Sequence, residues 1–263
     1  VSQATVSRAL RGATNVTEET RIKVQRAADQ LNFTLSKSAS ALASGKTMRV
    51  ILLVSGKLNE WFNSGVLQGV YEELAPVGYD VTPAFITDRS ELDRFFSQLP
   101  KSRNADAIII SSFQLMPAMR DQLQAIDLPT VGVNVPAESG YFDASISIDN
   151  SSAMTMAVRL LRSLGHTNIA FCSDYIPADM VYNTSQRTQA FADAAQANAT
   201  DGITFSLLTA DAHDAPLSKS DLASQLTAKL LSLPERPTAV CVETDQVAIA
   251  LVKDCLLYTS DAA

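Results

Sequence analysis

Residues Arg49–Ser55 read RVILLVS, and Ala105–Ser111 follow the same pattern as ADAIIIS. Continuous runs of this kind, rich in Val, Ile and Leu, are typical of parallel strands that are covered on both faces. Residues 64–75 and 151–164, by contrast, carry apolar side chains at helical spacing. The predicted strands are Arg49–Ser55, Tyr79–Phe85, Ala105–Ser111, Pro129–Val133, Ser145–Ile148, Asn168–Ser173, Ile203–Leu207 and Thr238–Val242.

The repeated order of strand and helix predicts an α/β fold, because successive parallel strands are joined by right-handed helical crossovers. The strands are too many for one sheet, so we expect two doubly wound parallel-sheet lobes that divide near residues 148–150. The predicted body spans residues 47–254, with lobe 1 at about 47–148 and lobe 2 at about 149–254. Residues 1–46 contain no strand signal and are expected to form a separate, all-α head.

The composition excludes several classes of protein. The chain has 263 residues, 46% hydrophobic and 19% charged, so it can bury a core and is not mainly disordered. No apolar run approaches the ~18 residues of a membrane helix, and the first residues lack the apolar segment of a signal peptide. Three widely spaced cysteines and two histidines favour neither a disulfide framework nor a metal site. We therefore expect a cytoplasmic protein without metal, cofactor or membrane association.

Charge is unevenly distributed along the chain. Residues 1–46 hold seven Lys and Arg against three Asp and Glu, a net charge of +4, whereas the rest of the chain carries −11. Local charge sets the affinity for phosphates, so a basic head on an acidic body favours nucleic-acid binding by the head.

The head begins with a stretch, SQATVSRALR, that predicts a helix with two different faces. Ser2 can cap its first turn. A helix that lies in the major groove needs a compact polar face, with Gln and Ala for base edges and Ser and Arg for phosphates and guanine. An ordinary surface helix is the alternative. The polar face consists of Gln3, Ala4, Ser7, Arg8 and Arg11, and the apolar face of Thr5, Val6, Ala9 and Leu10.

A second helix is predicted after a polar turn at residues 12–16. Thr17 is its expected cap, and acidic residues occupy its first turn, where the helix dipole favours negative charge. Its expected inner stripe consists of Ile22, Ala27 and Leu31.

Three head motifs follow one another in a fixed order: VSQATVSRAL at residues 1–10, VTEETRIKV at 16–24 and LNF at 31–33. They match V-S-x-x-T-V-S-R, V-x-x-x-T-R-x-x-V and L-x-Y of the lactose/galactose-repressor (LacI/GalR) family of bacterial transcription regulators, which this chain resembles. The order and spacing of the matches, from residue 1 to about 254, carry the resemblance. In the body, Asn59–Phe62 resembles N-P-F-F, Ile148–Asn150 x-D-N, Leu164–His166 L-G-H, Arg187–Phe191 R-x-x-G-F and Pro237–Asp245 P-T-A…N-D.

The resemblance implies a sequence-specific, DNA-binding transcription regulator with no enzymatic activity. It implies a repressor of carbohydrate-utilisation genes that acts as a homodimer on a double-stranded operator and associates with the bacterial nucleoid when bound. A small-molecule effector, a sugar or sugar derivative, would control operator binding. The resemblance also implies a chain truncated at both ends, with an incomplete helix-turn-helix head, an incomplete second lobe and a non-native tail at residues 255–263.

The resemblance further implies that residues 36–44 form a hinge helix, with Leu42 as an apolar wedge in the minor groove. Lys37 stands where the family has Arg, and Leu35 where it has Pro, so the start of the hinge is less defined. A flexible linker is the alternative that the composition favours. The complete set of predicted DNA-binding residues is Ser2, Gln3, Ala4, Thr5, Ser7, Arg8, Asn15, Lys37, Ala39 and Leu42.

The ligand site is expected between the lobes, at the carboxyl ends of the strands. Trp61 follows the first strand and offers an aromatic face to a sugar ring, and Arg187 can donate to hydroxyl groups in bidentate fashion. Packing in the core is the alternative role for each such residue. The predicted effector-binding residues are Asn59, Trp61, Phe62, Asn134, Arg187, Thr244 and Asp245.

Enzymatic motifs are weak or missing. Gly45-Lys46-Thr47 is similar to the end of a P-loop, but Ser40 stands at the required earlier Gly and the segment precedes a strand. No G-x-S-x-G, H-E-x-x-H or C-x-x-C is present. The alternative function is a bilobal sugar-binding receptor of a transport system, which would have a signal peptide and no recognition helix.

Overall fold

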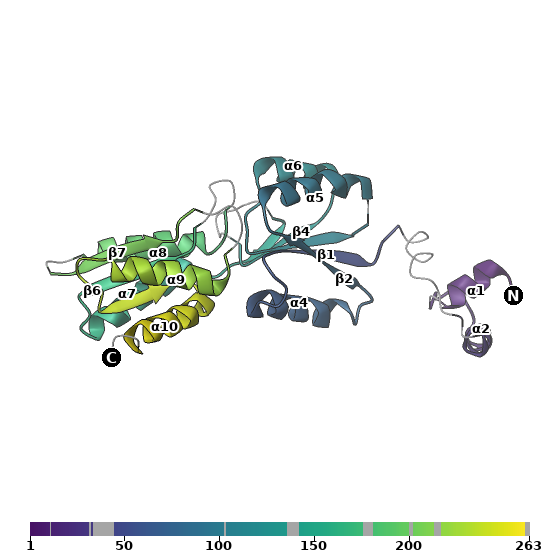
Figure 1. Ribbon diagram of the computed structural model, residues 1–263. Coiled ribbons are helices and arrows are strands. Elements are labelled where there is room, and N and C mark those ends of the chain that lie inside the picture. Colours follow the sequence, from purple (N-terminus) through teal and green to yellow (C-terminus); the bar gives the residue numbers. More distant parts are fainter. Residues whose placement is uncertain are drawn as a thin grey trace.

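The computed structural model describes residues 1–10, 12–31, 33, 45–102, 104–135, 142–175, 181–199, 202–212 and 217–260. Two parallel sheets form the body, one with the strand order β2-β1-β3-β4-β5 and one with the order β7-β6-β8 (Figure 1). All eight predicted strands are present, and their ends differ from the prediction by at most two residues. The predicted α/β fold with two parallel-sheet lobes is therefore confirmed.

Lobe 1 is built on β1, whose residues 50–54 are buried because the sheet is covered on both faces. α5 and α6 lie on one face and α4 on the other (Figure 1). Leu53, Phe96, Ile110 and Phe113 belong to its main apolar cluster and are almost fully buried. The elements are β1 (Arg49–Ser55), α4 (Trp61–Leu74), β2 (Asp80–Ile86), α5 (Arg89–Ser102), β3 (Ala107–Ser111), α6 (Pro117–Ala125), β4 (Thr130–Val133) and β5 (Ala144–Ile146).

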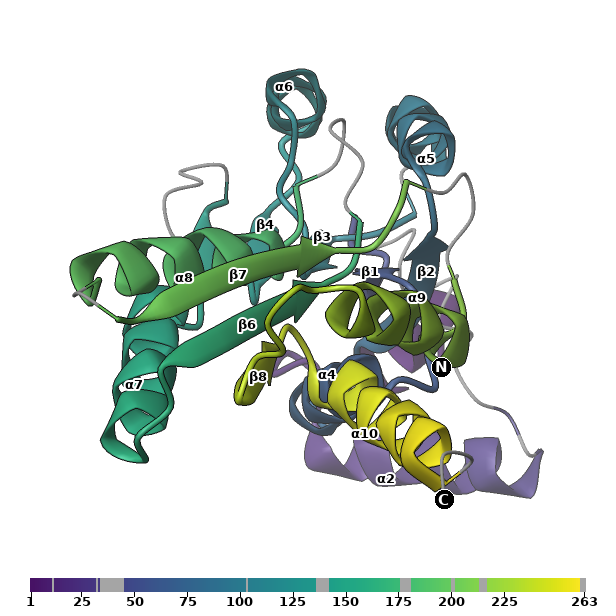
Figure 2. The ribbon, with the colours of Figure 1, turned by 60° about the vertical axis from the view of Figure 1, so that its left-hand side comes forward.

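Lobe 2 has an apolar cluster on each face of its sheet. Phe171 and Phe191 stack at 4.9 Å in the cluster beneath α7 and α8, and Leu226 lies in the cluster beneath α9 and α10. Figure 2 shows the two helix pairs on opposite sides of β6. The elements are α7 (Asn150–Ser163), β6 (Asn168–Ser173), α8 (Ser185–Ala197), β7 (Thr204–Thr209), α9 (Lys219–Leu231), β8 (Ala239–Val242) and α10 (Asp245–Ser260), which continues into the 255–263 segment.

The predicted L-G-H turn ends α7. Gly165 has a φ of 88°, and its N–H donates to the carbonyl of Arg162 at 2.9 Å. The N–H of His166 donates to the carbonyl of Leu161 at 3.1 Å. Glycine is favoured at this left-handed position because it has no Cβ.

The head consists of α1 (Gln3–Leu10) and α2 (Glu18–Gln30), and the side chain of Thr17 caps α2 as predicted. The predicted inner stripe of α2 is wrong, because Leu31 is 78% exposed and Ile22 45% exposed. The two helices meet instead through a small apolar cluster of Ala9, Val16 and Val24, with Val6 and Leu10 packed against it.

α7 forms where its spacing predicts a helix, but its core-facing stripe contains Met154, Val158 and Leu161. Met156 and Leu160, which share the helical spacing, are 70% and 58% exposed. Spacing identified the helix, but the position of the sheet decided which side of it was buried.

Candidate functional site

α1 presents the predicted polar face to solvent. Gln3, Ala4 and Arg8 are exposed, and Ser7 is half-buried. The hydroxyl of Ser2 accepts the N–H of Thr5 at 3.2 Å, so Ser2 caps the helix as predicted. The apolar side of α1 packs against α2, which fixes the polar side outward.

Two contacts order the side chains of this face. The Ser2 and Thr5 hydroxyls lie 2.9 Å apart, and Arg8 Nε donates to the carbonyl of Ala4 at 3.2 Å. Asn15 is exposed in the turn between the helices. Lys37, Ala39 and Leu42 lie outside the described residues.

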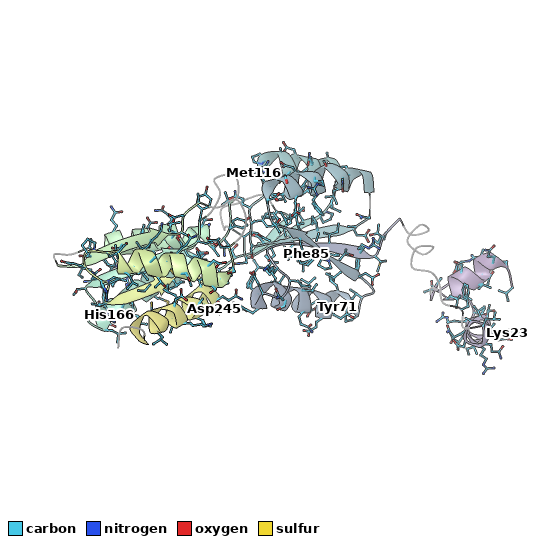
Figure 3. All side chains as sticks on the ribbon, viewed as in Figure 1. Lys23, Tyr71, Phe85, Met116, His166 and Asp245 are labelled. Atoms are coloured by element: carbon cyan, nitrogen blue, oxygen red, sulfur yellow. The ribbon has the colours of Figure 1, made fainter. Side chains whose placement is uncertain are left out.

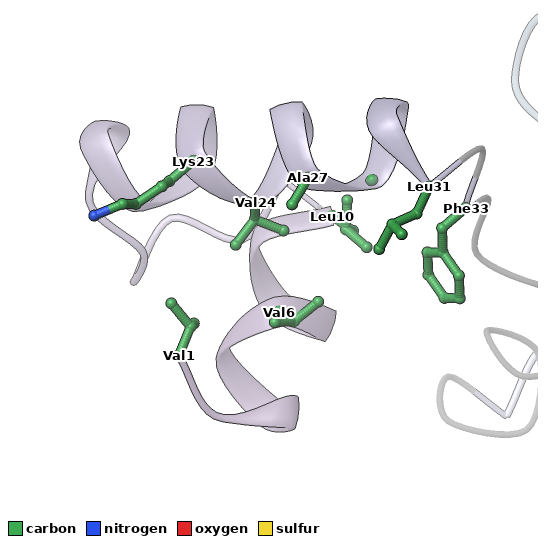
Figure 4. Close-up of a pocket in the computed structure, with 9 residues that line it drawn as sticks. Val1, Val6, Leu10, Lys23, Val24, Ala27, Leu31 and Phe33 are labelled. Carbon is green, nitrogen blue, oxygen red and sulfur yellow. The ribbon is translucent and has the colours of Figure 1, made fainter.

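An apolar groove of about 440 Å³ runs between α1 and α2 (Figure 4). Nearly all of its lining is apolar, with the stem of Lys23 at one end. The groove belongs to the packing side of α1, so the head separates an apolar side from the polar face described above. Its lining residues are Val1, Val6, Leu10, Lys23, Val24, Ala27, Ala28, Leu31 and Phe33.

The second candidate region lies where the strands of lobe 1 end. Ser112 follows β3 with a φ of 73°, and Asn134 follows β4 with a φ of 53°. Left-handed backbone is uncommon outside glycine, and such positions cluster at functional sites. Asn134 Nδ2 donates to Ser112 Oγ at 3.2 Å, so the two strand ends are joined.

Lobe 2 reaches these strand ends through Asn183, which is completely buried. Its backbone N–H donates to the carbonyl of Ser112 at 2.9 Å, and its side-chain Nδ2 donates to Asn134 Oδ1. Beside it, Phe113 and Tyr182 form an antiparallel bridge. Asn183 is therefore a direct polar link between the lobes.

From Asn183 the hydrogen bonds continue into lobe 2. Asn150 Nδ2 donates to Asn183 Oδ1 at 3.0 Å, and Arg187 Nε donates to Asn150 Oδ1 at 3.2 Å. Arg187 Nη1 then donates to the carbonyl of Glu243 at 2.6 Å. The predicted residues Asn134 and Arg187 thus belong to one network, because two further asparagines connect them.

Glu243 ends this network as a buried acid, only 9% exposed. Burial raises the pKa of its carboxyl, and the hydrogen bond from the N–H of Asp174 to Oε2, at 3.0 Å, opposes the rise. The nearby charge of Asp174 also raises this pKa, whereas those of Arg187 and Lys219 lower it. Burial and the charge of Asp174 thus favour the protonated form of Glu243, whereas the Asp174 N–H and the charges of Arg187 and Lys219 favour the ionised form.

Two further contacts cross between the lobes. Trp61 Nε1 donates to Asp245 Oδ1 at 3.3 Å, and Lys219 Nζ lies 3.9 Å from Glu60 Oε1. Figure 3 labels Asp245 at the end of lobe 2 that faces α4. The start of α4 therefore meets the starts of α9 and α10.

The other predicted effector residues lie around these contacts. The ring of Phe62 stands edge-on to Trp61, with 5.7 Å between centroids. Thr244 Oγ1 accepts the N–H of Val247 at 3.5 Å in the first turn of α10, and Asn59 is exposed ahead of α4.

Several residues of the network were not predicted from the sequence. Ser112 and Glu243 each follow a predicted strand, so the rule that ligands lie at the carboxyl ends of strands could have found them. Asn150 was recognised only as part of the x-D-N turn. Asn183 had no sequence signal, because its role depends on which lobe-1 residues it meets.

Within the described ranges, no helix is long and apolar enough to cross a bilayer. In the same part of the chain, no three His, Cys, Asp or Glu residues cluster as metal ligands would.

Comparison with known sequences finds family matches in the head and in lobe 2. Residues 1–36 match "Bacterial regulatory proteins, lacI family", and residues 158–257 match "Periplasmic binding protein-like domain". The transcriptional regulator AglR of Rhizobium meliloti is 26% identical, over 96% of this chain and 69% of its own length. The transcriptional repressor PurR of Vibrio cholerae is 28% identical, over 96% of this chain and 72% of its own length.

Solved structures share the same architecture. The lac repressor dimer bound to operator and the anti-inducer ONPF has a TM-score of 0.79 at 20% identity, covering 98% of this chain and 75% of that one. A LacI-family regulator of Lactobacillus casei with bound sucrose has a TM-score of 0.62 at 25% identity, covering 80% of this chain and 74% of that one. The helical head of this chain thus matches the lacI family of bacterial regulatory proteins, and its two parallel-sheet lobes share the architecture of solved LacI-family regulators.

Proposed function

We propose that this protein is a transcription repressor whose binding to a specific operator is controlled by a sugar-like effector between the lobes. The observation that carries the proposal is the exposed face of α1, with Gln3, Ala4 and Arg8, on a basic head attached to an acidic two-lobed body. A protein that only binds a sugar does not require a basic helical head of this kind.

The proposed DNA reading follows from the side chains of α1. A glutamine at the start of a recognition helix can bond adenine through both its amide atoms, and an arginine can bond guanine or a phosphate. Gln3 has the first of these roles and Arg8 the second. Ser2, Thr5, Ser7 and Asn15 would contact the phosphate backbone.

The residues between the lobes suit a ligand with several hydroxyl groups. Arg187 donates hydrogen bonds, Asp245 accepts them and Asn134 does both, while Trp61 offers an exposed aromatic face. A sugar ring has hydroxyls at its edge and apolar C–H groups on its faces, and both chemistries are present here. The relative with bound sucrose supports this ligand class.

We further propose that control works by a shift between conformations of the two lobes. A ligand that binds one arrangement of the lobes more tightly shifts the population toward it, and operator affinity changes with that population. A homodimer that reads a pseudo-palindrome in the bacterial cytoplasm is the form in which we propose it acts. We propose no catalytic activity.

The test is a selection from a pool of randomised DNA duplexes with the unaltered protein. One pseudo-palindromic motif is expected to be enriched, and the double variant Gln3→Ala, Arg8→Ala is expected to enrich none. Equal recovery of all sequences by the unaltered protein would contradict the proposal.

A sugar-binding receptor is the second candidate, favoured by the periplasmic binding protein-like match at residues 158–257. Isothermal titration with a panel of neutral mono- and disaccharides separates the two functions. Sugar binding without any effect on duplex selection would favour the receptor, whereas a change in duplex affinity would favour the regulator.

A further inference from the structure

Two aspartates of lobe 1 each accept hydrogen bonds from a threonine: Thr47, two residues before β1, and Thr130, the first residue of β4. Asp106 Oδ1 accepts the N–H of Thr47 at 2.7 Å and its hydroxyl at 2.9 Å. Asp143 Oδ2 accepts the N–H of Thr130 at 2.7 Å and its hydroxyl at 3.0 Å. We call these two pairs the Asp106 clamp (Asp106 with Thr47) and the Asp143 clamp (Asp143 with Thr130). They are chemically alike, but the Asp106 clamp lies where the chain enters lobe 1 from the head, and the Asp143 clamp lies within the lobe.

The Asp106 clamp is the more extensive one. Its second oxygen, Oδ2, accepts the N–H of Met48 at 2.9 Å, and Met48 has a left-handed φ of 53°. Burial would raise the pKa of Asp106, but the hydrogen bonds from Thr47 and Met48 outweigh it and lower the pKa. The N–H of Asp106 also donates to the carbonyl of Arg49 at 2.8 Å. One residue therefore determines the direction in which the chain enters β1.

Asp106 also lies directly before β3, whose other end is part of the polar network between the lobes. Ser112, just after β3, accepts hydrogen bonds from Asn183 and Asn134. From Asp106 to Ser112, at about 3.3 Å per residue, the chain spans roughly 20 Å. β3 is paired on both sides, with β1 and β4, so it is a stiff connection between Asp106 and Ser112.

We propose that Asp106 is a positioning residue that passes the state of the interlobe network to the DNA-binding head. In this path, a displacement of Asn183 moves Ser112. The paired strand β3 transmits the movement to Asp106, and the hydrogen bonds of Asp106 then change the direction of Thr47 and Met48. This inference rests on the proposed function and adds to it a path from the ligand site to the head.

The first test is a double-mutant cycle with the duplex that the unaltered protein enriches. Asn183→Ala removes the interlobe side-chain link and is expected to change duplex affinity by about fivefold or more. With Asp106→Ala the same Asn183→Ala change is expected to have no effect. With Asp143→Ala, the matched control, its effect is expected to persist in full. Independent, multiplicative effects of Asp106→Ala and Asn183→Ala would overturn the proposal.

A loss of folding is separated from a loss of coupling by thermal melting of both clamp variants, each of which is expected to unfold in a cooperative transition. If Asp106→Ala does not fold, Asp106→Asn takes its place, since the amide retains one acceptor oxygen. Enrichment of no duplex by the unaltered protein would refute the proposed function, and a second measurement tests the coupling without DNA.

That second measurement is amide hydrogen exchange of Thr47 and Met48, followed by NMR. Both amides are expected to exchange faster in Asn183→Ala than in the unaltered protein, although Asn183 lies at the opposite end of β3. Asp143→Ala is expected to leave their exchange unchanged. Equal exchange rates in Asn183→Ala and the unaltered protein would overturn the proposed path.

Discussion

Trp61, at the start of α4 in lobe 1, donates its indole N–H to the carboxylate of Asp245, at the start of α10 in lobe 2, over 3.3 Å. Trp61 is 62% exposed and is the single tryptophan of the sequence. The indole of Trp61 therefore lies at a contact between the two lobes, beside the proposed ligand site.

We expect the tryptophan fluorescence of the unaltered protein to change when a sugar binds, because ligand and lobe movement both alter the surroundings of the indole. Titration with the sugars that bind in calorimetry measures this. Asp245→Asn keeps an acceptor oxygen and should retain most of the response, whereas Asp245→Ala should lose it. An unchanged spectrum at saturating sugar would place the ligand away from Trp61.

On the head, Gln3→Ala is expected to change base preference, because it removes a bidentate amide from the exposed start of α1. Arg8→Ala is expected to cost about 1–3 kcal/mol of binding free energy if the guanidinium contacts a base. Selection from randomised duplexes, followed by titration of the enriched sequence, measures both. Gln25→Ala is the control, since Gln25 is an exposed glutamine on α2. A base preference for Gln3→Ala identical to that of the unaltered protein would exclude Gln3 as a base reader.

The buried Glu243 predicts a pH dependence of stability. Its pKa in the folded protein lies above the ordinary value of 4.5, so the folded state binds the proton more tightly than the unfolded state does. The stabilisation is complete below the ordinary pKa and is lost as pH rises through the raised pKa. Glu243→Gln cannot ionise, and its amide oxygen can still accept the Asp174 N–H.

We therefore expect the difference in unfolding free energy between Glu243→Gln and the unaltered protein to move in favour of the variant between pH 4 and pH 8, measured by urea denaturation. Titrations common to both proteins cancel in this comparison. A pH-independent difference for Glu243→Gln would mean that the folded protein does not raise the pKa of the Glu243 carboxyl.

Gly132→Ala tests the packing of β4. A Cβ at this position would lie 2.6 Å from Val135 Cγ2 and 2.8 Å from Phe142 Cδ2, so lobe 1 should lose about 1–3 kcal/mol of stability. Gly69→Ala in α4, where a Cβ meets nothing within 4 Å, should stabilise the protein by about 0.5–1 kcal/mol. Thermal melting measures both. Opposite signs are expected, and a loss for both variants would contradict this account.

Much of the architecture could be predicted from local patterns in the sequence. Arg49–Ser55 and Asn168–Ser173 are strands with the predicted bounds, because continuous apolar runs of that length suit buried parallel strands. The two faces of α1 and the caps at Ser2 and Thr17 likewise depend only on residues within one or two turns. These features were predictable because their causes lie close together in the chain.

The relations between distant residues were decided by the tertiary structure. Val24 rather than Leu31 is buried because α1 covers only one side of α2, and the burial of Val158 rather than Leu160 depends on where the sheet of lobe 2 lies. Asn183 joins Asn134 across 49 residues, and Asp106 holds Thr47 across 59. Each polar side chain has many possible partners in the sequence, and only strand order and lobe placement select one. The amino acids by themselves thus determined which segments become strands and helices and which face of α1 is polar. Long-range packing decided which side chains link the lobes, which carboxyl group is buried and how the chain enters lobe 1.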